Sequence, residues 1–146
     1  MRSGLGRSRH APVLIGRDLA PSVAVMSNDV RHQLGRLGED EAAAHMERLG
    51  YAIVTRNHRT RFGELDLVCF GHDTLVFVEV KTRRGSGVPW DALGARKQGR
   101  VRKMAASYLC EVTDRPLADA LRFDAIGVVF DPRGRMVRLD HLEGAF

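Results

Sequence analysis

The chain has 146 residues, of which 44% are hydrophobic and 28% charged, as is ordinary for one soluble globular domain. No apolar run approaches membrane-spanning length, and the two cysteines form no metal or redox motif, so we expect a cytoplasmic protein. The net charge of +5 favours a polyanionic partner, but residues 1–26 contribute +3 of it, so the position of the basic residues matters more than their sum.

The first 27 residues lack periodicity and contain Gly, Ser, Arg and Pro, which predicts a disordered basic extension before a domain at 28–146. Three interpretations fit this segment: a flexible arm, a weak targeting segment, or an upstream extension that is not translated, with Met26 as the start.

Residues 30–49 are predicted to form a helix that ends at Gly50. Gly35 and Ala42 are expected to let this helix approach a sheet closely. Its predicted core-facing stripe consists of Arg31, Gly35, Glu39, Ala42, Met46 and Leu49.

Residues 51–59 predict a first strand, and strands at 64–70 and 74–82 predict a β-hairpin around a turn at 71–73. If Phe70 pairs with Leu75, alternation places Asp66 opposite Glu79 on one face of the sheet. The same register places Glu64 opposite Lys81. A three-residue turn with a bulge would shift this register by one residue.

The second half of the chain predicts one more helix and two more strands. A mobile basic loop at 83–87 and a short turn or helix at 89–91 lead into a helix at 95–112. Strands at 121–130 and 135–142 flank a turn at 132–134. The order α-β-β-β-α-β-β predicts an α/β fold, a mixed β-sheet flanked by α-helices.

The hairpin concentrates charge in strands that are otherwise apolar. Directly opposed side chains have Cβ atoms about 4.5–5.5 Å apart, so Asp66 and Glu79 repel each other unless a cation lies between them. Together with Glu64 and Lys81 these two residues carry a formal charge of −2, which Mg²⁺ or Mn²⁺ would balance. The alternative is a solvated sheet face, on which Lys81 forms an ion pair with Glu64 worth about 0.2–1 kcal/mol.

Asp66, twelve residues and then Glu79-x-Lys81 resembles the PD-(D/E)-x-K nuclease motif. Seven ordered elements resemble the bacterial YraN-type family of small endonuclease-like proteins, over about residues 29–142. They are Gly35-x-x-Gly38-Glu39, Gly50-Tyr51, Asn57-x-Arg59, Gly63-Glu64-Leu65-Asp66-Leu67, Phe77-Val78-Glu79-Val80-Lys81-x-Arg83, Lys97-Gln98 and Arg122-Phe123-Asp124.

The resemblance implies a restriction-endonuclease-like fold and metal-dependent hydrolysis of DNA to a 5′-phosphate and a 3′-hydroxyl. Asp66, Glu79 and the Val80 carbonyl would hold the metal, and Lys81 would position the attacking water. The family is similar to archaeal Holliday-junction resolvases, which implies branched or structured DNA as substrate and a homodimer as the assembly.

Two further residues are candidates for the site. Glu39 lies on the inward stripe and is expected to act through a metal-bound water; the alternative is a surface glutamate near a helix N-terminus. Gln98 is either a helix glutamine near the metal, as in some related nucleases, or part of the helix surface.

Basic residues near the hairpin and on the second helix are candidates for DNA contact. The alternative is an ordinary solvated helix face. The candidates are Arg83, Arg84, Arg96, Lys97, Arg100 and Lys103.

Phe62 is expected to anchor a loop or the core rather than to stack on a base. Cys69 and Cys110 are expected to be buried thiols. Two non-enzymatic functions stay open: a nucleic-acid-binding module on a nuclease scaffold, and an interaction subunit of a repair or competence complex in which the acidic patch is a structural cation site.

Overall fold

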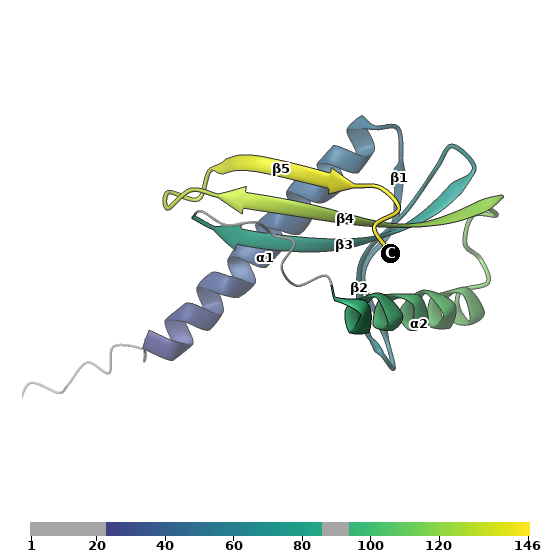
Figure 1. Ribbon diagram of the computed structural model, residues 1–146, viewed down its shortest axis with the longest axis horizontal. Helices are drawn as coiled ribbons and strands as arrows, with labels where there is room; N and C mark the ends of the chain where they lie inside the picture. Colours follow the sequence, from purple (N-terminus) through teal and green to yellow (C-terminus); the bar gives the residue numbers. More distant parts are fainter. Residues whose placement is uncertain (1–22, 86–93) are drawn as a thin grey trace, which may run out of the picture.

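The computed structural model describes residues 23–85 and 94–146, which form one mixed β-sheet and two helices (Figure 1). The helices are α1 (Val23–Arg48) and α2 (Ala95–Glu111). The strands are β1 (Ala52–Thr60), β2 (Gly63–Gly71), β3 (Thr74–Arg84), β4 (Ala120–Phe130) and β5 (Met136–Leu142).

The five strands lie side by side in chain order. Strands β3 and β4 are parallel, and the other neighbouring pairs are antiparallel. Parallel neighbours need a crossover connection, and α2 supplies it between β3 and β4. The predicted order α-β-β-β-α-β-β and the α/β class are confirmed.

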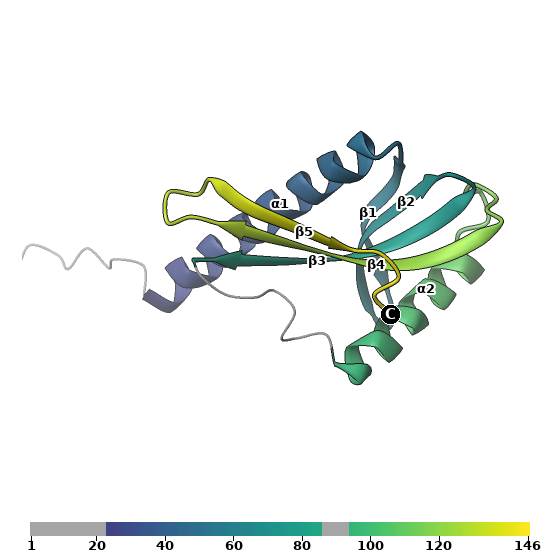
Figure 2. The same cartoon turned by 45° about the horizontal axis from the view of Figure 1, so that its top comes forward.

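Each helix covers one face of the sheet, as the two views show together (Figure 2). Buried Ala42 and Met46 of α1 pack with Leu67, Val76 and other residues of the strands on one face. Buried side chains of α2 pack with the residues that point to the other face. These α2 residues are Val101, Met104, Ala105 and Tyr108.

Helix α1 begins at Val23, seven residues before the predicted start. The expected disorder is therefore wrong for residues 23–27, while residues 1–22 lie outside the described chain. No glycine or proline interrupts the sequence between Val23 and Leu34, so the helix continues toward the N-terminus without a break. Its end is confirmed: Gly50 has φ 91°, and the Tyr51 N–H donates to the Met46 carbonyl.

The close approach of α1 to the sheet occurs at Gly38, not at Gly35. A Cβ atom added at Gly38 would overlap the Thr82 side chain of β3, whereas nothing lies within 4 Å of one added at Gly35. Arg31 and Leu49, the ends of the predicted stripe, are exposed. The actual contact face is thus rotated and shortened relative to the predicted one.

The predicted hairpin register is confirmed, because Phe70 pairs with Leu75 without a shift. His72 and Asp73 have φ values of 51° and 56°, the two positive angles of a two-residue type I′ turn. The paired residues end at Leu67 and Val78.

Beyond that point the two strands diverge. Strand β2 continues beside β1, with Glu64 opposite Arg59, and β3 continues beside β4. Neither Asp66 with Glu79 nor Glu64 with Lys81 is therefore among the paired residues, so the predicted direct opposition is not found for either pair.

Two smaller expectations also changed. Arg83 and Arg84 are the last residues of β3 rather than part of a loop, while the expectations for 86–87 and 89–91 lie outside the described residues. Cys69 is buried as predicted, but Cys110 is exposed on α2. Neither helix of the described ranges has the length and apolar character needed to cross a bilayer.

Candidate active site

A cavity of about 580 Å³ lies between the diverging strands β2 and β3 and the first half of α2. The strands contribute three carboxylates and one lysine, and α2 contributes three further basic side chains. The lining residues are Glu64, Asp66, Glu79, Lys81, Gly94, Arg96, Lys97, Arg100, Val101 and Met104. The structure thus brings the four charged hairpin residues into one cavity.

Asp66 bridges the two strands at the point where they separate. Its Oδ2 accepts a hydrogen bond from the Val80 N–H at 2.8 Å. Burial first, and then the negative charge of Glu79, raise the pKa of Asp66 to about 7, although the Val80 N–H acts in the opposite direction. A positive charge placed beside this carboxyl would favour its ionised form.

Glu79 lies next to two ammonium groups. Its Oε1 is 2.8 Å from Lys97 Nζ and 3.5 Å from Lys81 Nζ, and its side chain is 12% exposed. Burial first, and then the neighbouring Lys97, lower the pKa of Lys81. The charged form of Lys81 is thus less favoured than that of a freely solvated lysine.

The remaining predicted site residues lie at different places. Glu64 forms an ion pair with Arg59 at 3.5 Å while its side chain also lines the main cavity. Glu39 lines a neighbouring cavity of about 230 Å³ that shares Lys81 and is also lined by Val80. The charge of Glu39 reaches Asp66, whose pKa it helps to raise. Gln98 is half-buried and does not line the main cavity.

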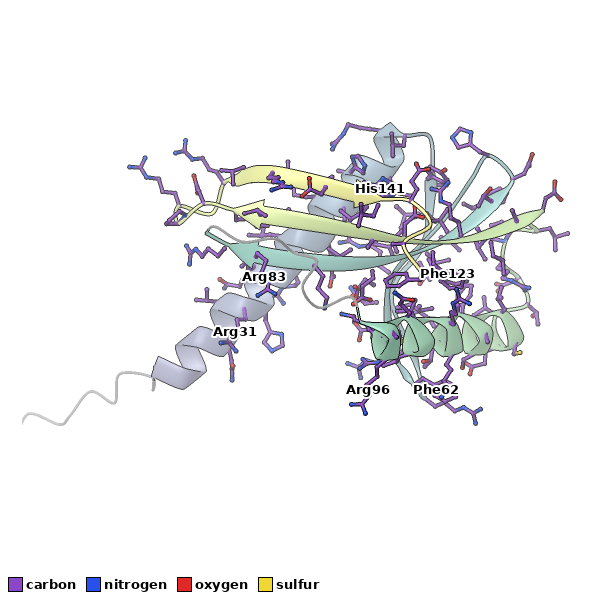
Figure 3. All side chains as sticks on the ribbon, in the orientation of Figure 1. Arg31, Phe62, Arg83, Arg96, Phe123 and His141 are labelled. Carbon is purple, nitrogen blue, oxygen red and sulfur yellow. The ribbon has the colours of Figure 1, made fainter. Side chains whose placement is uncertain are left out.

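The basic candidates divide into two groups. Arg96, Lys97 and Arg100 line the main cavity, with Lys103 one turn further along α2. Arg83 lies at the end of β3, well apart from Arg96 at the start of α2 (Figure 3). Arg84 donates to the Pro132 carbonyl in the turn after β4. The α2 group is therefore the one that faces the carboxylates.

Lys97 was predicted to contact DNA, and the structure places it on Glu79 itself. The pattern that reveals this position is its spacing of four residues before Val101, the first buried residue of α2. The formal charge of the cavity changes accordingly. Its four basic and three acidic side chains give +1, whereas the strands alone were expected to give −2.

Comparison with known proteins identifies relatives of the chain. Residues 38–128 match the family described as "Uncharacterised protein family UPF0102". The chain belongs to the UPF0102 family. This confirms the YraN-type resemblance, and the matched range contains every residue that lines the main cavity.

The similarity to individual UPF0102 proteins extends over most of the chain. A UPF0102 protein of Pelotomaculum thermopropionicum is 46% identical over 120 residues, which cover 81% of this chain and 98% of that protein. One from Parafrankia sp. is 44% identical over 119 residues, covering 80% and 98%. One from Frankia casuarinae is 47% identical over 116 residues, covering 77% and 95%.

Proposed function

We propose that this UPF0102 chain is a metal-dependent endonuclease that hydrolyses phosphodiester bonds in DNA. One observation carries the proposal: Asp66 and Glu79, from two diverging strands, share a cavity whose opposite wall is a row of basic side chains on α2. Carboxylates suit a divalent cation, and the basic wall suits the phosphates of a polyanion.

The residues present fit Mg²⁺ or Mn²⁺. Asp66 and Glu79 offer hard oxygen ligands. Burial first, and then the charge of Glu79, raise the pKa of Asp66, and a cation would relieve the repulsion between the two carboxylates. In the described ranges, no group of three or more His, Cys, Asp or Glu side chains could hold a metal ion. Two carboxylates with the Val80 carbonyl, waters and substrate phosphate are the kind of ligand set that Mg²⁺ accepts.

When bound, the metal supplies Lewis-acid polarisation of the scissile phosphate. Lys81, close to Glu79, would orient the attacking water and stabilise negative charge that develops on the phosphate. Arg96, Arg100 and the N-terminal end of α2, where Gly94 lines the cavity, present positive charge to the neighbouring phosphates.

The substrate proposed is branched or otherwise structured DNA. The basic side chains of the cavity would bind the phosphate backbone, and contacts to phosphates fix position without reading the sequence of bases. Affinity for DNA should accordingly fall steeply with salt concentration. A homodimer, as in the resolvases that the family resembles, is part of the same proposal.

A non-catalytic DNA-binding module is the second candidate, and one observation favours it. Glu79 already has two lysine partners, so the carboxylates of the cavity are partly neutralised without a metal. Such a protein would bind DNA through the α2 cations and leave it intact.

Cleavage of branched, duplex and single-stranded DNA in Mg²⁺ or Mn²⁺ separates the two functions. We expect Glu79→Gln and Lys81→Met to lower the cleavage rate at least about a hundredfold, the effect of removing a group that stabilises the transition state. Binding of DNA without metal should persist in both variants. The matched control is Glu47→Gln, the same change at an exposed glutamate of α1.

Binding without cleavage in every metal tested would establish the second candidate instead. Calorimetric titration with Mn²⁺ adds a readout that does not depend on turnover. The proposed function predicts that the wild type binds Mn²⁺ and that Glu79→Gln loses this binding.

A further inference from the structure

The turn between β1 and β2 presents an aromatic side chain at a fixed position. Thr60 pairs with Gly63, which leaves Arg61 and Phe62 as the two turn residues. The Phe62 N–H donates to Thr60 Oγ1 at 3.1 Å, and Thr60 Oγ1 donates to the Gly63 carbonyl at 2.8 Å. These bonds hold the backbone under the Phe62 ring, which lies at the end of the hairpin beneath α2 (Figure 3).

Phe62 is half-buried, packs against the core under α2 as expected, and also meets two cations. The Arg61 guanidinium carbon lies 4.7 Å from the ring centroid, and Lys103 Nζ lies 6.0 Å from it. These distances fall within the range of cation–π attraction. We name Arg61, Phe62 and Lys103 the turn platform.

The turn platform lines a second cavity, of about 390 Å³. The acidic residue of this cavity, Glu111, has one oxygen engaged by the Ser107 hydroxyl at 2.6 Å. An aromatic ring with two cations therefore faces the space, and its chemistry matches a flat ring attached to a phosphate.

This second cavity adjoins the main one. A Cβ atom added at Gly63, next to Phe62, would lie 2.9 Å from Arg100 Nη2 and 3.0 Å from Met104 Sδ, and both of these side chains line the main cavity. Glu64, the next residue along β2, lines the main cavity as well. Gly63 thus lies in the chain between Phe62 of the platform and Glu64 of the main cavity, with Arg100 and Met104 close beside it.

We infer that the turn platform binds an unpaired nucleotide of a DNA strand whose neighbouring phosphates lie in the main cavity. The inference rests on the proposed function for its ligand class. Inside a duplex both faces of a base are covered by its neighbours, so a ring can stack only on a base that lies at the end of the helix or outside it. The platform would thereby direct the protein to junctions between single-stranded and duplex DNA.

Fluorescence anisotropy in metal-free buffer tests this inference apart from catalysis. The probes are a blunt duplex and the same duplex with a short single-stranded extension. We expect the wild type to prefer the extended duplex and Phe62→Leu to lose about 5-fold to 150-fold of that preference, as base–aromatic stacking predicts. Phe62→Tyr should retain the preference, because it keeps the ring.

Two further variants serve as a matched pair. Arg61→Ala should weaken binding of the extended duplex, whereas Arg133→Ala, the same loss of charge at an exposed residue of the turn between β4 and β5, should not.

The leucine of the Phe62→Leu variant retains the apolar contact with the core, and a melting curve confirms that this variant is folded.

Equal affinity of the wild type for both probes would overturn the inference, as would a Phe62→Leu variant with the wild-type preference. DNA cleavage by a wild type that shows no such preference would overturn the inference and leave the proposed function intact. A Phe62-dependent preference in a protein that cleaves no DNA would support the platform and overturn the proposed nuclease.

Discussion

At the scale of single residues, Lys97 and a divalent cation would compete for the same carboxylate. The Lys97 ammonium lies 2.8 Å from Glu79, and its side chain is 25% exposed. A partly exposed ion pair contributes up to about 1 kcal/mol, so its removal should strengthen metal binding by about fivefold. We therefore expect Lys97→Met to bind Mn²⁺ more tightly than the wild type, as measured by calorimetric titration.

The neighbouring Gln98→Met is the control for that experiment, because Gln98 does not line the main cavity and should leave the affinity unchanged. Weaker Mn²⁺ binding by Lys97→Met would contradict the competition. It would indicate instead that Lys97 holds Glu79 in the orientation that a metal needs.

The contact of Lys97 with Glu79 could not be predicted from the sequence. Its four-residue spacing from Val101 identifies the face of α2 on which it lies, but not which strand that face covers. Lys97 and Glu79 are eighteen positions apart in the chain, on either side of the connection between β3 and α2. Local sequence patterns do not predict such a non-local contact.

At the scale of elements, the contact between α1 and β3 depends on one glycine. A methyl group at Gly38 would overlap Thr82, so Gly38→Ala should lower the free energy of unfolding by about 1–3 kcal/mol through overpacking. Gly35→Ala, on the same helix, meets nothing within 4 Å and should be neutral or stabilising by up to about 1 kcal/mol. Thermal denaturation of both variants measures the difference, and equal effects would refute it.

The hairpin shows why some elements could be predicted and others could not. The register of β2 and β3 follows from a turn of two residues and from alternation along the strands, and both are local. Their separation beyond Leu67 and Val78 depends on β1 and β4, which pair with the outer sides of the two strands. The cavity exists because of this separation, so the sequence predicted its residues better than its shape.

At the scale of the whole molecule, one buried carboxylate joins three elements and the C-terminal segment. Asp124 of β4 is fully buried and accepts hydrogen bonds from Arg122, from the Gly144 N–H and from His141 of β5 at 2.8–3.0 Å. His141 in turn lies 3.0 Å from His45 of α1, ring nitrogen to ring nitrogen. Burial, and then the neighbouring His141, lower the pKa of His45, so this chain of rings favours a neutral His45.

This network predicts acid sensitivity. Burial alone would raise the pKa of Asp124, but the bonds from His141, Arg122 and Gly144 outweigh it and place the pKa below its usual value. Such a carboxyl stabilises the fold above the unfolded-state pKa of about 3.9, and this contribution is lost as the pH falls through the folded-state pKa.

We expect Asp124→Asn to lower the free energy of unfolding near neutral pH by about 3 kcal/mol, because Arg122 loses a buried partner. The free energy of unfolding of the wild type should decline below about pH 4, and this decline should be smaller in the variant. Urea denaturation across that range measures both effects. Asp119→Asn, the same change at an exposed residue, is the control, and an unchanged acid response in Asp124→Asn would contradict the assignment.

The acidic and basic residues of the main cavity come from different parts of the sequence, so they are synthesised at different times. All three of its carboxylates precede residue 85, and three of its four cations follow residue 94. A nascent polypeptide therefore exposes the acidic half before its basic counterpart, and before β4 can flank β3. The full set of cavity charges is therefore present only after α2 has been synthesised, so the site cannot form while the chain ends before that helix.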